Sequence, residues 1–305
     1  MKKFLLGVAG VFIMLVGIAG LVLPILPGWV LIFFGLSLIS PTMADRLRHR
    51  VWRKFFKQDV IVIEGWSMLA VRAGLTTKHF PMKLSKTDEL LPENNQLRFK
   101  TLLNGSKIVR SHKAAGQERF VFLNQVHGDQ VEVLDDESAY ARPGFYHLKN
   151  TDAVITRVPG LSLLVMTADC LPIFFYAKGW AGLAHAGWRG TQKEIALKTL
   201  NALIRCSGAH PKDVRVAFGP SISVDHYEVG PEFRSHFPPE SLRERDGKLF
   251  FNLSGENRRQ LLGAGVLERH LVDLHICTVD ENSDFYSFRR EHEAAGRMVS
   301  FIMLR

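Results

Sequence analysis

The chain has 305 residues, of which 47% are hydrophobic and 23% are charged, a balance that is typical of folded proteins and excludes extensive disorder. The formal net charge is +9, but residues 1–57 hold eight of the 39 Lys and Arg and one of the 30 Asp and Glu, a net of +7. Residues 58–305 therefore carry only +2, which argues against nucleic acid as a partner. The three cysteines, Cys170, Cys206 and Cys277, are too few for a disulfide framework and fit a reducing compartment.

A long uncharged segment lies near the N-terminus. Residues 4–39 contain no charged side chain. One helix of that length would extend about 54 Å at about 1.5 Å per residue, whereas a bilayer core needs about 30 Å. Two prolines also interrupt the segment. We therefore predict a transmembrane helical hairpin in which Phe4–Val22 spans the bilayer and Trp29–Ser40 forms a shorter arm. A cleaved signal peptide is the alternative, but its apolar region would be about 7–15 residues. The stretch GLVLPILPGWVLIFFGLSLIS resembles the PGPGW family of putative transmembrane proteins.

Basic residues flank this segment on both sides. Lys2 and Lys3 precede it, and ADRLRHRVWRKFFK, residues 44–57, follows it. The positive-inside rule places both flanks in the cytoplasm. The second flank mixes bases with large apolar residues, which predicts an amphipathic helix that lies on anionic membrane lipids. We expect residues 1–57 to form a membrane anchor and residues 58–305 to form a cytoplasmic catalytic domain.

Strands dominate the predictions beyond residue 57. The run LSLLVMT at 161–167 is continuously apolar, as in a strand that is buried on both faces. The stretch FVFLNQVHGDQVEVL reads as two strands joined at a His–Gly turn. Further strands are predicted at 60–65, 152–157, 214–220, 274–279 and 298–304, and a hairpin at 173–177 and 180–186.

Two helices are predicted among these strands. Thr191 and Glu194 have the T-x-x-E spacing of a capping box, which predicts the start of a helix that Gly208 and Pro211 end. A second helix is predicted over Glu256–His270. The helices do not alternate regularly with the strands, so we expect an α+β fold with large sheets.

Three side chains that suit chemistry fall at predicted strand ends. His127, Cys170 and His185 each lie at a turn, where functional sites are commonly built. Two imidazoles and a thiolate would fill three positions of a tetrahedral zinc site and leave the fourth open. The residues alone leave two alternatives open: ordinary core packing, and a Cys170–His185 nucleophile and base pair.

Two arginine-containing stretches are candidate anion sites. In GWRGT, residues 187–191, glycines precede the predicted helix, so free backbone N–H groups and Arg189 could hold a phosphate. In FYSFRR, residues 285–290, Arg289 and Arg290 follow an aromatic stretch and are a second candidate for phosphate or ribose. A tight turn with a solvated arginine and a surface arginine pair are the respective alternatives.

Five motifs together resemble the YfiH-like, or laccase-domain, family over roughly residues 120–305. They are NQVHG, TADCLPI, AHAGWRGT, GPSISVDHYEVG and CTVDENSDFYSFRREHEAAGR. The resemblance implies a four-layer α/β/β/α sandwich and a zinc site made by His127, Cys170 and His185. It also implies phosphorolysis of adenosine, inosine, guanosine and S-methyl-5′-thioadenosine, and deamination of adenosine. An older family label is polyphenol oxidase, but none of the twelve histidines forms a His-x-His pair, which favours Zn²⁺ over copper.

For this chemistry Asp169, which adjoins Cys170, is the best-placed acid and base, and the alternative is a turn carboxylate that caps backbone N–H groups. Arg189 and Arg289 are the candidate phosphate ligands. Two rival functions remain open: a metal-free cysteine hydrolase that uses Cys170 and His185, and an inactive membrane-bound scaffold. The scaffold is considered because residues 70–90 keep only a trace of the glycine-rich motif that the family carries early in the domain.

Overall fold

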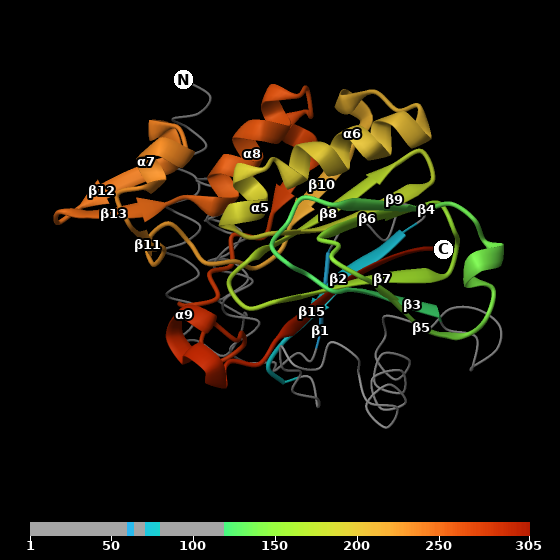
Figure 1. Cartoon of the computed structure of the whole chain (residues 1–305), viewed down its shortest axis with the longest axis horizontal. Coiled ribbons are helices and arrows are strands. Elements are labelled where there is room, and N and C mark those ends of the chain that lie inside the picture. The colour runs from blue at the N-terminus through green and yellow to red at the C-terminus, as the bar shows by residue number, and fades with distance from the viewer. Residues whose placement is uncertain (1–59, 64–70, 80–118) are drawn as a thin grey trace, which may run out of the picture. The chain divides into compact units, whose positions relative to one another are not determined.

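The computed structural model describes residues 60–63, 71–79 and 119–305, which Figure 1 shows in colour. The chain divides into two compact units, Met1–Lys57 and Gln58–Arg305, and every described residue belongs to the second. The predicted hairpin and amphipathic helix lie outside the described residues, so the membrane anchor and the domain boundary stay predictions. Within the described ranges, no helix combines the length and the hydropathy needed to cross a bilayer.

The first of two large sheets joins segments that are far apart in the sequence. Its strand order is β1-β2-β15-β7-β3-β5, with parallel pairing at β7–β3 and β3–β5 and antiparallel pairing elsewhere. Six of the seven residues of β7 are buried, as expected for a strand with both faces covered. The strands are β1 (Val60–Val62), β2 (Val71–Thr76), β3 (Arg119–Leu123), β5 (Gly144–Leu148), β7 (Leu161–Thr167) and β15 (Met298–Leu304).

The second large sheet contains the predicted hairpin as its centre. Its order is β14-β10-β8-β9-β6-β4, and β8 and β9 pair in antiparallel register from Leu171–Ala186 to Ala177–Trp180. Strands β8 and β9 are almost wholly buried, because helices pack on one face of this sheet and the first sheet packs on the other. The strands are β4 (Val131–Leu134), β6 (Ala153–Thr156), β8 (Leu171–Ala177), β9 (Trp180–Ala186), β10 (Arg215–Phe218) and β14 (Leu271–Asp273).

Helices cover one face of the second sheet. Figure 1 shows α5, α6 and α8 above β8, β9 and β10. Helix α6 turns Ile195, Ala196, Leu200 and Leu203 toward the sheet, where they join the core that includes Phe175 and Phe218. These helices are α5 (Trp188–Gln192), α6 (Ile195–Ser207) and α8 (Leu253–Gly263).

A small third sheet extends from the helical side. It joins β11 (Glu228–Val229), β12 (Leu242–Arg245) and β13 (Lys248–Phe251), with α7 (Phe233–His236) beside it. The rings of Phe233, Phe237 and Phe251 pack together at 4.2–5.5 Å between centroids and anchor this extension to the main core. No pattern in the sequence predicted this sheet.

A second core lies between the two large sheets. Leu163 and Val165 of β7 and Ile302 of β15 belong to one cluster with Phe174 of β8 and Leu183 of β9. The α/β/β part of the predicted sandwich is therefore confirmed. A fourth layer is not found among the described residues, so that part of the prediction stays untested.

The start of the first helix differs from the prediction. A short helix, α5, already begins at Trp188, and α6 follows after Glu194, which has a left-handed φ of 62° and no capping hydrogen bond. The Thr191 hydroxyl accepts a hydrogen bond from Asn257 at 2.9 Å and does not cap the helix. The capping-box prediction is therefore wrong, because the side chain finds a partner on α8.

Two other predicted elements have different bounds. The predicted helix 256–270 is α8, which ends at Gly263 because Gly265 turns the chain with a φ of 96°. The predicted strand 274–279 is wrong, since the strand there is β14 at Leu271–Asp273. His275 then breaks the extended backbone with a φ of 52°, and only Cys277 makes an isolated bridge to Ser221.

Candidate metal and active site

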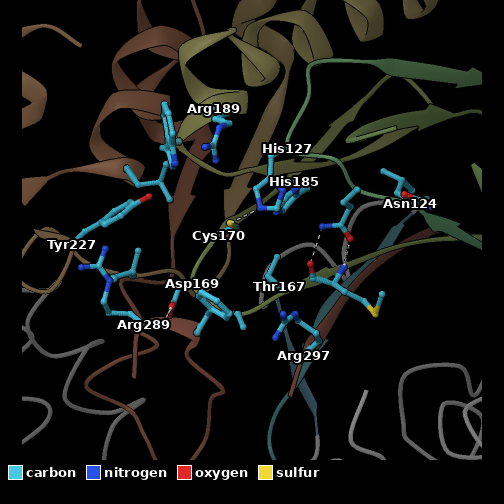
Figure 2. Close-up of a pocket in the computed structure, with 18 of the residues that line it drawn as sticks. Asn124, His127, Thr167, Asp169, Cys170, His185, Arg189, Tyr227, Arg289 and Arg297 are labelled. Atoms are coloured by element: carbon cyan, nitrogen blue, oxygen red, sulfur yellow. Dashed lines mark hydrogen bonds between the residues drawn. The ribbon is translucent and has the colours of Figure 1, made fainter. Parts of the chain in front are cut away.

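A pocket of about 390 Å³ opens where strand ends of both large sheets meet. The loops after β3 and β7, the end of β9, helix α5 and the short helix α9 (Phe288–Glu291) all contribute to its wall. Figure 2 shows the polar residues of this wall turned toward one another around the pocket. They include Asn124, His127, Asp169, Cys170, His185, Arg189, Tyr227, Arg289 and Arg297.

The three predicted metal ligands come together at the centre of this pocket. His127, Cys170 and His185 each offer one ligand atom, and these atoms lie within 4.8 Å of one another. Cys170 Sγ is 3.8 Å from His127 Nε2, and the two imidazole rings meet edge to face at 4.8 Å. The sequence placed these residues at three separate turns, and the structure gathers them into a group that could hold a metal ion.

A buried carboxylate organises two of these ligands. Asp152 Oδ1 lies 2.8 Å from His185 Nδ1 and accepts the backbone N–H of His127 at 3.0 Å. Its Oδ2 accepts the N–H groups of Val126 and Gly128 at 3.2 and 2.7 Å. Because Nδ1 of His185 is held by Asp152, its Nε2 is left for the pocket. Sequence reasoning missed Asp152, which lies at the start of a predicted strand and has no motif of its own.

The same carboxylate stabilises an uncommon backbone conformation. His127 has a φ of 59°, in the left-handed region that only a few per cent of residues other than Gly adopt. Three successive N–H groups of its turn point at the one carboxylate of Asp152. Burial opposes ionisation of Asp152, but the hydrogen bond and charge of His185 and these N–H groups keep its pKa below the ordinary value. The position of His127 is therefore fixed by a charged anchor.

The pKa values of Cys170 and His185 depend on each other's charge. Burial opposes the thiolate, but the charge of His185 and the hydrogen bond from His127 lower the pKa of Cys170 to about 6. Burial also opposes the imidazolium, yet Cys170 and Asp152 raise the pKa of His185 to about 9. At neutral pH the metal-free site therefore holds a thiolate, which is the form that binds a metal or attacks as a nucleophile.

The lack of a side chain at Gly187 leaves space beside the donor atoms of His127 and Cys170. Gly187 follows β9, and a Cβ built on it would lie 2.9 Å from His127 Cδ2 and 3.1 Å from Cys170 Sγ. Any side chain at this position would push against two of the three ligands. The glycine thus leaves space beside the donor atoms, although its φ is ordinary for any residue.

Asp169 occupies the pocket wall but has both carboxylate oxygens engaged. Its Oδ1 accepts the Thr278 hydroxyl at 2.6 Å, and its Oδ2 accepts the backbone N–H of Arg289 at 2.6 Å. The residue is 8% exposed and has a φ of 93°. These contacts match the alternative of a turn carboxylate, with one backbone N–H group and one hydroxyl as its partners. The proton-shuttle role predicted for Asp169 stays a prediction.

The two predicted phosphate ligands both line the pocket. The Arg189 guanidinium stacks on the Trp188 ring at 4.3 Å. The Arg289 guanidinium lies 5.3 Å from the Tyr227 ring and donates to the Glu228 carbonyl at 3.0 Å. Both arginines are exposed, and aromatic rings limit the directions in which their side chains can turn.

Arg290, the other candidate, has a structural role. Its guanidinium donates to the carbonyls of Thr278, Val279 and Phe285, each at 2.8 Å, and to Glu291 at 2.6 Å. Its three carbonyl partners thus all lie in the loop that precedes α9, and its fourth partner is the last residue of α9. The surface-pair alternative is also excluded for Arg290, because the side chain is half-buried in this loop.

Two further pocket residues were not singled out from the sequence. Arg297 is half-buried, and burial lowers its pKa. Burial and the charge of Cys170 raise the pKa of Tyr227, so its hydroxyl stays protonated. Both residues lie within motifs that the sequence already showed, so their position in a matched motif was the signal that could have identified them.

The comparisons with known proteins agree with this fold. The family described as multi-copper polyphenol oxidoreductase laccase matches residues 100–305, and the family of putative transmembrane proteins (PGPGW) matches residues 3–54. A purine nucleoside phosphorylase of Deinococcus radiodurans is 38% identical over 194 residues, which cover 61% of this chain and 70% of the relative. Adenosine deaminase RL5, from an unknown prokaryotic organism, is 34% identical over 200 residues, or 60% of this chain and 74% of the relative.

A solved structure shares the fold. The crystal structure of the Bacillus licheniformis hypothetical protein YfiH matches with a TM-score of 0.68 and 29% identity, over 81% of this chain and 97% of that one. The family resemblance predicted from five sequence motifs is thereby confirmed. The chain belongs to the laccase-like YfiH family, with a PGPGW segment at its N-terminal end.

Proposed function

We propose that this protein is a zinc-dependent purine nucleoside phosphorylase with adenosine deaminase activity. The proposal depends mainly on one observation: three arginines and a Cys–His–His donor group line the same pocket. Relatives that carry the names of both activities support it. The proposed substrates are adenosine, inosine, guanosine and S-methyl-5′-thioadenosine, with phosphate as the second substrate.

The residues fit a zinc ion. His127, Cys170 and His185 supply the nitrogen and sulfur donors that zinc prefers, and three protein ligands leave a position open for substrate or water. Asp152 holds His185 as such a ligand requires, and Gly187 keeps the space clear. When bound, the zinc would supply a Lewis acid that stabilises developing negative charge.

The arginines suit a dianionic substrate. Arg189, Arg289 and Arg297 approach the pocket from different segments, and guanidinium groups bind phosphate through paired hydrogen bonds. We assign to them the binding of phosphate and its alignment with the anomeric carbon of the nucleoside. In phosphorolysis a phosphate oxygen bonds to C1′, the bond from C1′ to the purine nitrogen breaks, and the purine takes up a proton.

Two side chains are candidates for managing that proton. The Tyr227 hydroxyl is kept protonated by burial and the Cys170 charge, so it can donate a hydrogen bond to the phosphate or the departing base. Asp169 is the alternative, but its two engaged oxygens favour a role in holding Arg289 in place.

Product analysis tests this proposal. The full-length chain, purified in detergent and loaded with zinc, is given each nucleoside with and without phosphate. We expect free purine base and ribose 1-phosphate only when phosphate is present, and inosine from adenosine without it. Absence of all of these products from a folded, zinc-loaded sample would contradict the proposed enzyme activity. Separately, copper instead of zinc in the protein as purified would exclude zinc as the proposed metal.

A metal-free cysteine hydrolase is the second candidate, because the pocket holds a nucleophile and a base, and a buried acid orients the base. Cys170, His185 and Asp152 make that arrangement, and the lowered pKa of Cys170 is suited to it. The second imidazole favours a metal instead, since a nucleophile needs one base and His127 brings another donor to the same sulfur. Stoichiometric zinc in active protein excludes the hydrolase.

The proposed enzyme is tethered to the membrane by residues 1–57, with its pocket on the cytoplasmic side. The match of residues 3–54 to a family of putative transmembrane proteins supports this. The full chain is expected in the membrane fraction after alkaline carbonate extraction. Recovery of the whole chain in the supernatant would contradict the tether.

A further inference from the structure

A second group of metal-ligand side chains lies away from the pocket. His226, Cys277 and Asp280 each offer one ligand atom, and these atoms lie within 4.8 Å of one another. Asp280 Oδ1 is 2.6 Å from His226 Nε2. None of these three residues lines the pocket that holds Cys170. The proposed phosphorylase and deaminase activities do not use them.

Two facing backbone turns bring these side chains together. In the first, the N–H groups of His226 and Tyr227 both donate to the Ser223 carbonyl, at 3.1 and 3.0 Å. In the second, the Glu281 N–H donates to the Cys277 carbonyl at 3.1 Å, which places Cys277 and Asp280 on the same turn. The backbone therefore sets the approach of these side chains to one another.

The two turns are also fixed to each other. Thr278 donates its N–H to the Ser221 carbonyl at 3.1 Å, and Ser221 donates its N–H to the Ile276 carbonyl at the same distance. A parallel bridge joins Ser221 and Cys277. This backbone pairing holds the ligand atoms near one another without a metal, so an ion would meet a partly assembled site.

We propose that His226, Cys277 and Asp280 form a second site for a divalent cation of the zinc type. An imidazole nitrogen, a thiolate sulfur and a carboxylate oxygen are all zinc ligands, whereas magnesium and calcium select oxygen donors. Cys277 is a free thiol. The side chains of His226 and Asp280 are 37% and 48% exposed, which gives the ion a route from solvent and leaves room for a water ligand.

The position of this site indicates a structural role. Tyr227 follows His226 directly, and Thr278 follows Cys277 and donates its hydroxyl to Asp169 at 2.6 Å. A cation bound here would link the turn that carries Tyr227 to the turn that holds Asp169. It would stabilise one wall of the pocket from behind without contacting substrate.

Metal content of the full-length chain tests this second site. After equilibration with zinc and removal of loose metal, we expect about two equivalents per chain for the wild type, one at each cysteine-containing group. His226→Gln, Cys277→Ser and Asp280→Asn should each lose one equivalent and keep the other. Cys170→Ala should lose the other one, and Cys170→Ala with Cys277→Ser should lose both. Cys206→Ser is the matched control, since Cys206 belongs to neither group, and should keep both.

Cobalt provides a second readout that does not depend on activity. Substitution with Co²⁺ in the Cys170→Ala background should give a thiolate-to-cobalt charge-transfer band that Cys277→Ser abolishes. His226 and Asp280 are partly exposed, so their variants are expected to keep the wild-type circular dichroism spectrum. The proposal is overturned if folded Asp280→Asn and Cys277→Ser bind as much zinc as the wild type, or if Cys170→Ala binds none.

Discussion

Asp152 and Asp169 are two buried carboxylates that support the same pocket, Asp152 through His185 and Asp169 as part of its wall, and they differ in what they hold. Asp152 is fully buried, accepts three backbone N–H groups and grips the imidazole of His185. Asp169 accepts one hydroxyl and one N–H group, from the segment that carries Arg289. The first carboxylate therefore organises the proposed metal ligands, and the second organises the side of the pocket to which we assign phosphate binding. Asp169 was the predicted acid because it adjoins Cys170 in the sequence. In the structure it is Asp152, distant in the sequence, whose carboxylate contacts His185.

The largest effect is expected for Asp152→Asn. In the wild type, all the groups around the Asp152 carboxylate donate hydrogen bonds to it. In the variant, an amide NH₂ group would replace one oxygen, face an N–H group and remain unpaired. We expect zinc affinity to fall roughly 10–100-fold and the free energy of unfolding to fall by about 3 kcal/mol. Zinc titration and urea unfolding measure the two losses.

Asp135→Asn is the matched control for this variant, since Asp135 is an exposed aspartate of the same domain. It should change neither property. Wild-type zinc affinity in folded Asp152→Asn would show that the carboxylate does not orient the metal ligands, and the contrast with Asp169 would then disappear.

Gly187→Ala tests the ligand side without altering a charge. The new methyl group would press on His127 and Cys170, which must move apart to admit it. We expect zinc affinity to fall about tenfold, with a stability loss of about 1–2 kcal/mol. Gly263→Ala is the control, because a Cβ at Gly263 meets nothing within 4 Å. Equal zinc affinity in both variants would mean that the space beside Gly187 is not used by a ligand.

Asp169→Asn is expected to have a smaller and different effect. An amide can still accept the Arg289 N–H and can donate to the Thr278 hydroxyl, so the loop keeps part of its support. Loss of about 1 kcal/mol of positioning would raise the KM for phosphate about fivefold and leave kcat and zinc content near wild type. A fall in kcat of about 10²-fold or more, with the loss of one limb of the pH profile, would instead support the proton shuttle predicted from sequence.

The pH dependence of the metal-free protein is the mildest test. Cys170 has a lowered pKa of about 6, so its thiolate is present above that pH and lost below it, and alkylation of Cys170 should be half-maximal near pH 6. His185 has a raised pKa of about 9, so it keeps its proton until the pH rises through that value.

These two pKa shifts have opposite effects on how the free energy of unfolding changes with pH. Between about pH 6.5 and 9 the folded pair keeps on His185 the proton that the unfolded pair keeps on Cys170, so both states bind equal numbers. The contribution of the pair to stability should therefore be flat in that window. Urea unfolding of the metal-free wild type and of Cys170→Ala checks this, and a slope present only in the wild type would contradict the assigned charges.

Much of the fold was predictable where burial sets the pattern. The strands β7, β9 and β15 agree with their predicted positions, because short, mainly apolar runs bounded by turns are typical of strands with both faces covered. The third sheet and the true start of α5 were not predictable. Their positions depend on contacts such as Asn257 with Thr191, which join residues far apart in the sequence.

The candidate site was also predictable only in part. The family motifs pointed to His127, Cys170 and His185, and the structure brings all three together. Asp152 was missed because nothing in its own sequence neighbourhood shows that the start of a strand contacts these ligands. Arg297 was missed although it lies within one of the matched motifs. Supporting residues are found by tracing hydrogen bonds in space, and one sequence does not contain that information.

The pairing of β2 with β15 has a consequence for biosynthesis. Leu75 is opposite Ser300, so the two strands are neighbours in the sheet although more than 200 residues separate them. During translation β2 emerges long before its partner exists, and closing so long a loop is slow. Until then β2 offers an unpaired strand edge, at which nascent chains can associate with one another. A chaperone that covers Val71–Thr76 during synthesis is therefore expected to raise the yield of folded protein.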